Sequence, residues 1–544
     1  MPYKQLGKLQ AGTPDCTEFA FYSFRGGLNI KGAPQLIGDE DLSIAYDGYL
    51  RPDGAFQLRN GMATYGTAIA NYPLYLARFY QTVQNGAAVS PVTKLLGVCN
   101  GILYNITSGS GNSTIGTVNG TQATFARFQD PNDPNFASGL TDVTIICSGS
   151  GGPYVYDGTN FYTPAGWSQA TGAQWCSVVN GIVWFGGIPT LPNQIFGTGD
   201  GITASFESLP GYRNFVLSSY VTGLCAQGSG ATAALIIGRN TGVSVLYGTG
   251  PSTFFLQDLP FQDGIVAGRS MVSANGVVYF LGHMAYYSFD TQTIPQQISQ
   301  KVEPWILNDP FTPGYPMNGY NQFSWAQVYN NRLHLGYASS STSPNVILCY
   351  DLVMQGWTCL RPTPGLTSMV LLDAPNDPDP YVALVGSSTT GQAYTWDYVA
   401  GSTQTILDGA APVLAQVQSK YFKLGVPGTN KALERFYPEF QNAGAFQTNF
   451  TVSTDYGAQN TQTETTNPAP VQRILTWDAG PLYGWDNSVW GGPTQYIPFG
   501  SPTSRLDLPG IQGESFAFGV SMTTALASWI WAGGTGVFSQ QGRT

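Results

Sequence analysis

Short runs of β-branched and aromatic residues recur along the chain, each preceded by Asn-Gly or a close variant. Clear copies begin at Asn100, Asn180 and Asn275, and a less regular copy begins at Asn330. Asn-Gly suits the positive φ angles of a type I′ turn. Each copy therefore predicts a β-hairpin with a strand on both sides of the turn.

A second pattern is an aromatic strand that ends in an aspartate, followed by a turn and another strand. It ends at Asp157, Asp290, Asp351 and Asp397. Two hairpins per unit, recurring roughly every 40 to 60 residues, are typical of the blades of a β-propeller. We find five to seven candidate units and favour about six blades. Tandem β-sandwiches fit the same pattern and remain the alternative fold.

We expect an all-β chain in three parts. An N-terminal arm and opening motif occupies residues 1–66, a β-propeller follows over 67–407, and a C-terminal antiparallel β domain, sandwich-like, occupies 408–544. The last part contains a tryptophan cluster, Trp477, Trp485 and Trp490. This cluster fits a core, a subunit contact or a platform for stacking sugars, and the pattern does not choose among them.

The composition supports the β-rich prediction and excludes other classes. Only 10% of the 544 residues are charged, against roughly 25% in ordinary soluble domains. Aromatic residues reach 13%, which is the reverse of a disordered chain. Coiled coils and helical bundles need abundant charged helix formers, which this chain lacks.

Cysteine usage and hydropathy bear on the compartment. The seven cysteines are scattered without any C-x-x-C spacing, which predicts buried free thiols and folding in a reducing compartment. Cys349 and Cys359 lie at a spacing that would also allow pairing across a hairpin. Residues 1–22 do not resemble a signal peptide. The apolar runs are shorter than a membrane span, so we expect none.

The sequence predicts no catalytic, cofactor-binding or metal-binding residues, and we expect no enzyme. It has two histidines, His283 and His334, both in strand-like runs that favour structural roles, and it has no nucleophile elbow, P-loop or zinc-helix motif. A propeller glycosidase would need two facing carboxylates. The available carboxylates mostly follow strands, where they cap turns: Asp157, Asp200, Glu207, Asp258, Asp263, Asp290, Asp351 and Asp397. The Asp-Pro loops near Asp130 and Asp373 are predicted to be solvated turns rather than calcium sites.

Charge is unevenly distributed. Between Lys94 and Lys301 the chain has no lysine, four arginines and nine acidic residues. Proteins that grip DNA gather basic residues to neutralise phosphates. This span therefore argues against specific nucleic-acid binding and suits a weakly acidic conduit that DNA would slide past.

One N-terminal segment is distinctive. Phe24-Arg25-Gly26-Gly27-Leu28-Asn29 is followed by Pro34-Gln35-Leu36-Ile37, Asp47-Gly48, Gly54 and Leu58-Arg59-Asn60-Gly61. This opening motif resembles that of the tail nozzle proteins of short-tailed bacteriophages, also called tail tubular or tail hub proteins. Residues 260–407, including Leu348–Asp351 and Gly356-Trp357, are similar to the propeller region of the same family. Asp47 stands where the family usually has asparagine, and no proline or second basic residue follows Arg59.

The resemblance implies a structural virion protein of the tail, assembled in the host cytoplasm. It would form a homo-oligomer, a hexameric ring, with portal and adaptor proteins and tail fibres as partners. The ring would close and then conduct the genomic DNA during ejection without binding it specifically. A carbohydrate-binding tail or adhesin propeller remains the alternative function.

Overall fold

The computed structural model describes residues 16–85, 88–107, 111–129, 142–199, 207–250, 252–373, 381–398, 406–424, 431–442, 446–455, 458–466, 506–522 and 529–540. Their regular structure is almost entirely β-strand, with one short α-helix, α1 (Glu303–Ile306), in these ranges. The chain divides into two units. The first comprises Met1–Gly61, Tyr350–Leu360 and Asp397–Thr544, and the second comprises Met62–Cys349 and Arg361–Trp396.

The second unit is built from small antiparallel sheets, as the sequence predicted for a β-propeller. Five of them have four strands each, paired in chain order. Their strands are β7 (Leu74–Asn85), β8 (Ala88–Cys99), β9 (Ile102–Ile106) and β10 (Ser113–Thr117); β11 (Thr124–Gln129), β12 (Asp142–Cys147), β13 (Tyr154–Tyr156) and β14 (Phe161–Tyr162); β15 (Trp175–Val179), β16 (Ile182–Gly186), β17 (Gln194–Gly197) and β18 (Asn214–Val216); β19 (Val221–Gln227), β20 (Ala234–Arg239), β21 (Gly242–Tyr247) and β22 (Phe255–Asp258); β23 (Val272–Ala274), β24 (Val277–Leu281), β25 (Tyr286–Phe289) and β26 (Gln296–Gln297).

Two further sets complete this unit. One consists of β27 (Trp325–Tyr329), β28 (Arg332–Tyr337) and β29 (Val346–Asp351). The other consists of β31 (Leu366–Asp373), β32 (Tyr381–Ser387) and β33 (Gly391–Tyr398). Its fourth strand is β6 (Gly61–Ile69), which precedes β7 in the chain but pairs with β33. The start of the unit is therefore built into its last sheet.

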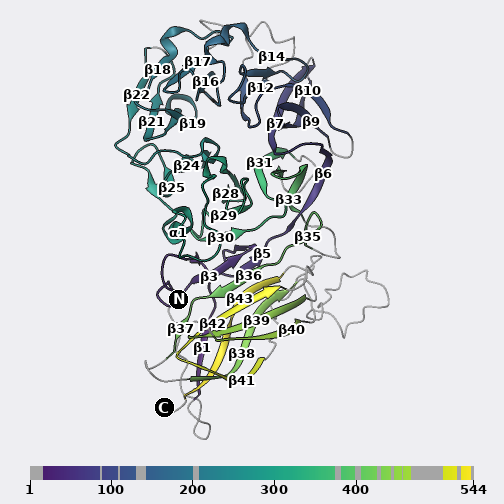
Figure 1. Cartoon of the computed structure of the whole chain (residues 1–544), viewed down its shortest axis with the longest axis vertical. Helices are drawn as coiled ribbons and strands as arrows, with labels where there is room; N and C mark the ends of the chain where they lie inside the picture. The colour runs from purple at the N-terminus through teal and green to yellow at the C-terminus, as the bar shows by residue number, and fades with distance from the viewer. Residues whose placement is uncertain are drawn as a thin grey trace. The chain divides into compact units, whose positions relative to one another are not determined.

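The first strands of the sets contact one another in a closed cycle. The order is β7, β11, β15, β19, β23, β27 and β31, and β31 contacts β7 again. Figure 1 shows the sets arranged around a ring in this order. Four-stranded sheets in such a ring are typical of β-propellers.

Apolar side chains between adjacent sheets hold the ring together. Phe79 and Leu96 of the first sheet share a cluster with Tyr156 of the second. Leu74 of the first sheet and Leu384 of the last share another. Each sheet therefore buries both of its faces against its two neighbours, which no single sheet achieves alone.

The Asn-Gly turns have the predicted conformation. Asn100 and Gly101 have φ angles of 47° and 75°, and Asn275 and Gly276 have 52° and 78°. The first pair joins β8 to β9, and the second joins β23 to β24. Positive φ at both central positions is the requirement of a type I′ turn, so this prediction is confirmed.

The first unit contains two main sheets. Its first sheet has the order β4-β5-β43-β38-β41, with β1 also paired to β43. In its second sheet the strands of this unit follow the order β30-β2-β3-β36-β42-β39-β40, with β37 also paired to β42. The strands are β1 (Cys16–Phe21), β2 (Gly27–Leu28), β3 (Asp41–Tyr46), β4 (Gly48–Leu50), β5 (Phe56–Leu58), β30 (Trp357–Leu360), β36 (Gln416–Ser419), β37 (Phe422–Lys423), β38 (Lys431–Asn442), β39 (Phe446–Thr454), β40 (Ala458–Thr466), β41 (Leu506–Gly513), β42 (Ser515–Met522) and β43 (Trp529–Gln540), beside a small hairpin of β34 (Leu407–Asp408) and β35 (Ala411–Pro412).

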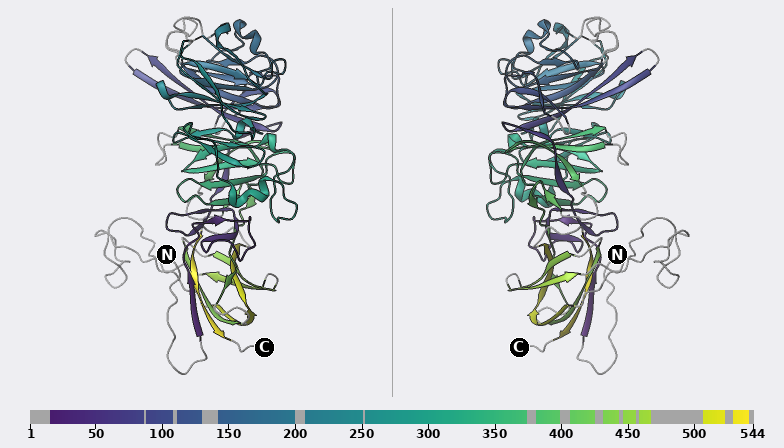
Figure 2. Two further views of the ribbon diagram at one scale, coloured as in Figure 1. Left: turned by 90° about the vertical axis from the view of Figure 1, so that its left-hand side faces the viewer. Right: turned by 90° about the vertical axis from the view of Figure 1, so that its right-hand side faces the viewer.

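Aromatic rings pack these two sheets against each other. The Phe436 ring on β38 lies 4.5 Å from that of Phe518 on β42, and the Phe21 ring on β1 lies 5.5 Å from Phe518. Figure 2 shows the two layers, in which purple N-terminal strands lie among yellow-green C-terminal ones. This packing of two sheets around one core is that of a β-sandwich.

The N-terminal segment was predicted as a separate part up to residue 66. Its described residues from 16 to 61 belong to this unit. β1 pairs with β43 from Cys16 to Phe21, and β3 pairs with β36. The predicted tryptophan cluster, Trp477, Trp485 and Trp490, lies outside the described residues. Among the described residues, no helix is both long and apolar enough to span a membrane.

Candidate functional site

The opening motif is one structural junction. Gly27 on β2 has a φ of +64° and pairs with both Asp41 and Trp357. A Cβ atom on Gly27 would lie 2.6 Å from the Trp357 carbonyl oxygen, and one on Gly26 would collide with the Asp41 carboxylate. Both segments that carried the family resemblance, the opening motif and Gly356-Trp357, thus meet here.

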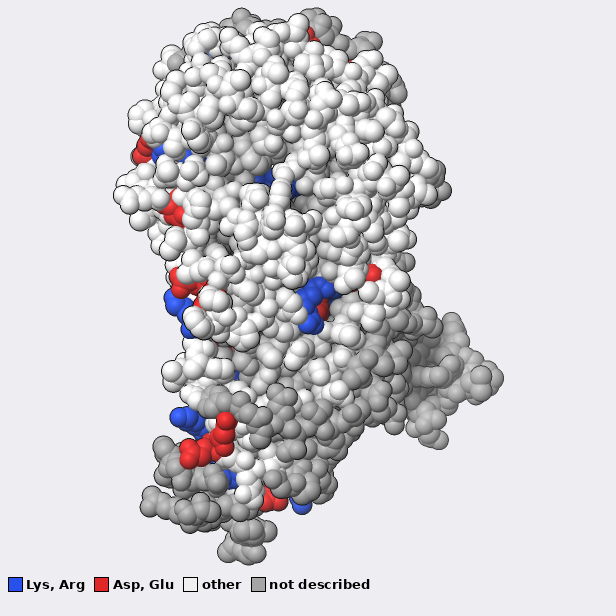
Figure 3. Space-filling model, viewed as in Figure 1, with Lys and Arg blue, Asp and Glu red and all other residues white. Residues whose placement is uncertain are grey.

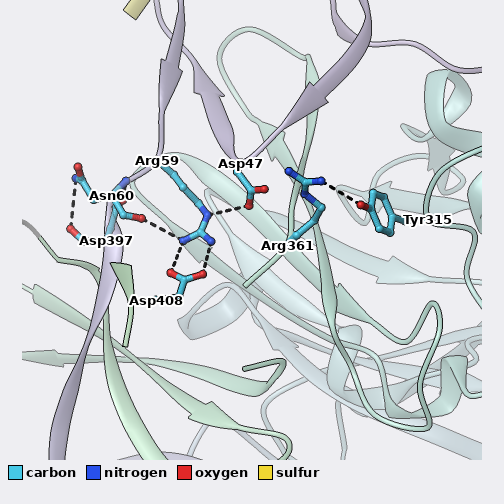
Figure 4. A network of polar contacts seen from close by, with 7 residues as sticks. All are labelled: Asp47, Arg59, Asn60, Tyr315, Arg361, Asp397 and Asp408. Carbon is cyan, nitrogen blue, oxygen red and sulfur yellow. Dashed lines mark hydrogen bonds and ion pairs between the residues drawn. The ribbon is translucent and has the colours of Figure 1, made fainter. Parts of the chain in front are cut away.

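Arg59, the basic residue that closes the motif, lies between two carboxylates (Figure 4). Its Nη1 and Nη2 donate to the two oxygens of Asp408 at 2.8 and 2.5 Å. Its Nε donates to Asp47 Oδ1 at 3.2 Å. All three side chains are buried, with exposed fractions of 4% or less. Asn60 extends the network, because its backbone N–H donates to Asp397 Oδ1 at 3.2 Å.

The electrostatics of this network keep Arg59 charged. Burial by itself lowers the pKa of Arg59, but the carboxylates of Asp408 and Asp47 outweigh that effect and raise the pKa overall. The backbone adds to the fixation, since Arg59 N–H donates to the Asp47 carbonyl and Asp47 N–H to that of Cys359. A group this buried and paired stabilises a fold and offers nothing to a substrate.

Three of the candidate carboxylates cap turns, as the sequence predicted. Asp157, Asp290 and Asp351 follow or end β13, β25 and β29. Each accepts hydrogen bonds from the backbone N–H groups two and three residues later, at 2.5 to 3.0 Å. Such Asx-type turns explain the recurrence of the pattern without any catalytic role.

Other candidates in the described residues also have hydrogen-bond or ion-pair partners. Asp263 accepts backbone N–H bonds from His283 and Met284 and the Tyr287 hydroxyl at 2.8 Å. Asp258 pairs with Arg239, and Glu207 accepts the Tyr162 hydroxyl. Asp397 belongs to the Arg59 network, and Asp200, Asp130 and the loop after Asp373 lie outside the described residues.

The two histidines differ in environment. His334 on β28 is 1% exposed and packs edge-on to Trp396 at 6.1 Å. Burial, followed by the nearby charge of Arg332, lowers the pKa of His334 to about 3. His283 is exposed in a loop. Both positions agree with structural roles, and His334 stays neutral at physiological pH.

A cavity of about 340 Å³ lies among the first strands of the ring. Strands β7, β11, β15, β19, β27 and β31 and the turn before β23 all contribute to its wall. Because these strands are successive members of the closed cycle, the cavity lies on the axis of the propeller. We call it the axial cavity.

The charged residues that line the axial cavity are arginines. They are Arg78, Arg127 and Arg269, and its described lining residues include no lysine, aspartate or glutamate. Figure 3 shows blue basic atoms in a hollow of the propeller, on a face that is mostly white with scattered red and blue atoms elsewhere. Two of the four arginines in the acidic span, Arg127 and Arg269, thus line this cavity. The acidic span was predicted to suit a weakly acidic conduit, whereas the axial cavity of the same unit is lined by arginines.

Each arginine lies over an aromatic ring. Arg127 lies 4.6 Å from the centre of the Tyr80 ring, Arg78 lies 5.3 Å from the same ring, and Arg269 lies 4.4 Å from Tyr75. Guanidinium groups are attracted to aromatic faces in this range. These contacts fix the planes of the three charged groups. Sequence reasoning missed the cavity, because its residues come from strands scattered over the whole unit.

Metal and thiol chemistry find little support in the described ranges. Within them, no group of three or more His, Cys, Asp or Glu side chains has the geometry to hold a metal ion. The six cysteines whose side chains are described are buried free thiols, including Cys349 and Cys359. Burial raises the pKa of Cys225 to about 12, so its reactive thiolate form is suppressed.

Comparisons with known proteins find only distant likenesses to solved structures. No protein-family model and no curated protein matches this chain. A solved structure of BBS1N is 10% identical, with 63% of this chain and 98% of that chain covered and a TM-score of 0.38. The extracellular domain of a putative hybrid two-component system from B. thetaiotaomicron is 12% identical, with 72% and 48% covered and a TM-score of 0.36. An exo-β-1,3-galactanase from Phanerochaete chrysosporium is 10% identical, with 88% and 100% covered and a TM-score of 0.22. Likenesses this distant carry no argument about function.

Proposed function

We propose that this chain is a structural virion protein, the tail nozzle or hub of a short-tailed bacteriophage, without catalytic activity. The observation that carries the proposal is the junction of Gly27, Trp357 and the Arg59 network. The motif residues that suggested the family serve there to join distant segments of the chain. A motif with this role supports a shared fold rather than a shared active site.

We further propose a seven-bladed propeller, one blade more than the sequence favoured. Five four-stranded sheets, the set that begins with β27 and the set closed by β6 together make seven members of the cycle. Seven lies within the five to seven units that the sequence suggested, and the last member is closed by β6, which pairs with a strand more than 300 residues later.

The outer strands support assembly into a ring of copies. β18 and β22 are the outermost strands of adjacent sheets. They expose Val216 and Phe255, at 63% and 61%, with Tyr220 between them in the chain at 61%. Apolar and aromatic side chains without charge are typical of the cores of interfaces between identical subunits. We propose that this surface contributes to the hexameric ring.

Assembly of the purified protein tests the proposal. We expect rings in negative-stain images and a mass near six copies in analytical ultracentrifugation, alone or with portal and adaptor proteins. Phe255→Glu combined with Val216→Glu is expected to block ring formation and leave the unfolding midpoint unchanged. Gln169→Glu, an exposed control, is expected to assemble normally.

Two outcomes would count against the nozzle function. Compact monomers under all conditions, with partners present, would contradict it. Specific binding on a glycan array, with loss of host adsorption in Trp485→Ala, would favour the carbohydrate-binding adhesin instead.

A further inference from the structure

Arg269 is the most unusual residue of the axial cavity. Its Nη2 donates to the Phe323 carbonyl oxygen at 3.1 Å. Its Nε and Nη1 are shut off from solvent and have no hydrogen-bond partner in the protein. A buried cationic donor without an acceptor is costly. Arg269 therefore contributes two N–H donors without an acceptor, and they lie out of reach of a water molecule in the cavity, so a ligand reaches them only if the side chain moves.

The other two arginines add positive charge to the same space. Arg127 is partly neutralised, because its Nε and Nη2 donate to the buried Asp142 Oδ1 at 2.9 and 2.7 Å. Asp142 itself does not line the cavity, and no acidic residue does among the described residues of its wall. Three guanidinium groups therefore line one cavity in a chain with a net charge of −10.

The remaining wall is mixed, with neutral polar side chains such as Thr124, Thr144 and Gln327 among apolar and aromatic ones. It includes Tyr75, Phe125, Trp175 and Trp325, together with Met271 and Met369. A volume of about 340 Å³ is at the lower end of the range for small-molecule sites, roughly 300–1,000 Å³. Such sites are mostly apolar and have a few polar groups that fix the orientation of the ligand.

We propose that the axial cavity binds a sugar-sized molecule that carries a carboxylate or phosphate group. Guanidinium groups match the geometry of both oxyanions and bind them through paired N–H donors. The anion would accept hydrogen bonds from Nε and Nη1 of Arg269, while the body of the molecule would lie against the aromatic wall. A single bare anion would leave most of the cavity unfilled.

This site is independent of the proposed tail function. A nozzle needs no small ligand, and ring assembly can succeed or fail without any effect on the cavity. A nucleic-acid strand is a poorer occupant, because its phosphates need a run of basic residues along a groove. The axial arginines instead line one local cavity.

Calorimetric titration of the purified full-length protein tests the proposal. The probes are glucuronate for the carboxylate, glucose 6-phosphate for the phosphate, neutral glucose and inorganic phosphate. We expect one or both sugar anions to bind and to bind more weakly at higher salt, because salt screens the charge contacts. Glucose is expected not to bind, and inorganic phosphate to bind at least tenfold more weakly than the better sugar anion.

Variants identify the site. Arg269→Met should weaken binding at least tenfold, and Arg269→Lys should also weaken it, since lysine keeps the charge but loses the planar pair of donors. The matched control Arg51→Met, at a half-exposed arginine of the other unit, should bind like the unaltered protein. If Arg269→Met does not fold, Arg78→Met gives the same test from strand β7.

Three outcomes would overturn the proposal. They are no binding of either sugar anion up to about 10 mM, equal binding of glucose, and unchanged affinity in the arginine variants. Binding of single-stranded DNA that excludes both sugar anions would show a nucleic-acid site instead.

Discussion

Arg59 shows what a single buried side chain contributes in a chain with few charges. It is held by Asp47 and Asp408, and removal of its guanidinium would leave two buried carboxylates without a counter-charge. The network also fixes where the opening motif ends. The cost of removing Arg59 therefore comes mainly from the two buried carboxylates that it leaves unpaired.

We expect Arg59→Met to lower the free energy of unfolding by about 3–5 kcal/mol, the range for breaking one partner of a buried ion pair. Arg51→Met, which removes the exposed contact with Asp53, should cost at most about 1 kcal/mol. Urea unfolding followed by tryptophan fluorescence measures both. Equal losses in the two variants would contradict the structural role of the network.

His334 gives the molecule a predictable response to acid. Its pKa is about 3 in the folded protein and near 6.5 in an unfolded chain. As pH falls below 6.5 the unfolded state takes up a proton first, so stability decreases with falling pH until the folded pKa is reached. Well above pH 6.5, His334 is neutral in both the folded and the unfolded state, so it adds no pH dependence to the stability.

The expected result is a shallower acid loss in His334→Leu than in the unaltered protein, by up to about 3 kcal/mol near pH 4. Unfolding midpoints between pH 7 and pH 4 measure it. His283→Gln, at the exposed histidine, is expected to follow the unaltered protein. Parallel curves for His334→Leu and the unaltered protein would refute this account.

At the scale of elements, a very short strand joins two longer ones. β2 has two residues, yet it lies between β3 and β30 and pairs in parallel with both. Its first residue, Gly27, needs a left-handed backbone and a close approach to Trp357. Only glycine meets both conditions without strain.

Gly27→Ala is therefore expected to destabilise the first unit by at least about 1–2 kcal/mol, the cost of a left-handed backbone for other residues, and more because of the contact with Trp357. Gly211→Ala is the control, since a Cβ there meets nothing within 4 Å. Thermal unfolding compares the two. A Gly27→Ala protein as stable as the control would show that the junction adapts freely.

Local patterns predicted local structure well in this chain. The Asn-Gly turns and the Asp-capped strand ends were readable, because each depends on residues that are neighbours in the sequence. The pairing of β6 with β33 and the lining of the axial cavity were not. Both join residues hundreds of positions apart, and no spacing in the sequence marks Arg78 and Arg269 as neighbours of one space.

For the whole molecule, the order of the segments is as informative as their structure. Residues 16–61 pack with strands that are synthesised much later, and β6 can complete its sheet only after β33 has been made. The propeller therefore cannot close until most of the chain exists, and the sandwich cannot form until nearly all of it does. Contacts of such long range slow folding.

This order leaves aromatic side chains of strand β1 without their packing partners during synthesis. Phe19 and Phe21 emerge from the ribosome before their partners Phe422 and Phe518, which follow some 400 and 500 residues later. At about 5–20 residues per second, these aromatic side chains stay uncovered for tens of seconds. The segment around β1 is thus open to chaperone binding during synthesis. A chain whose synthesis stops early leaves these aromatic side chains uncovered.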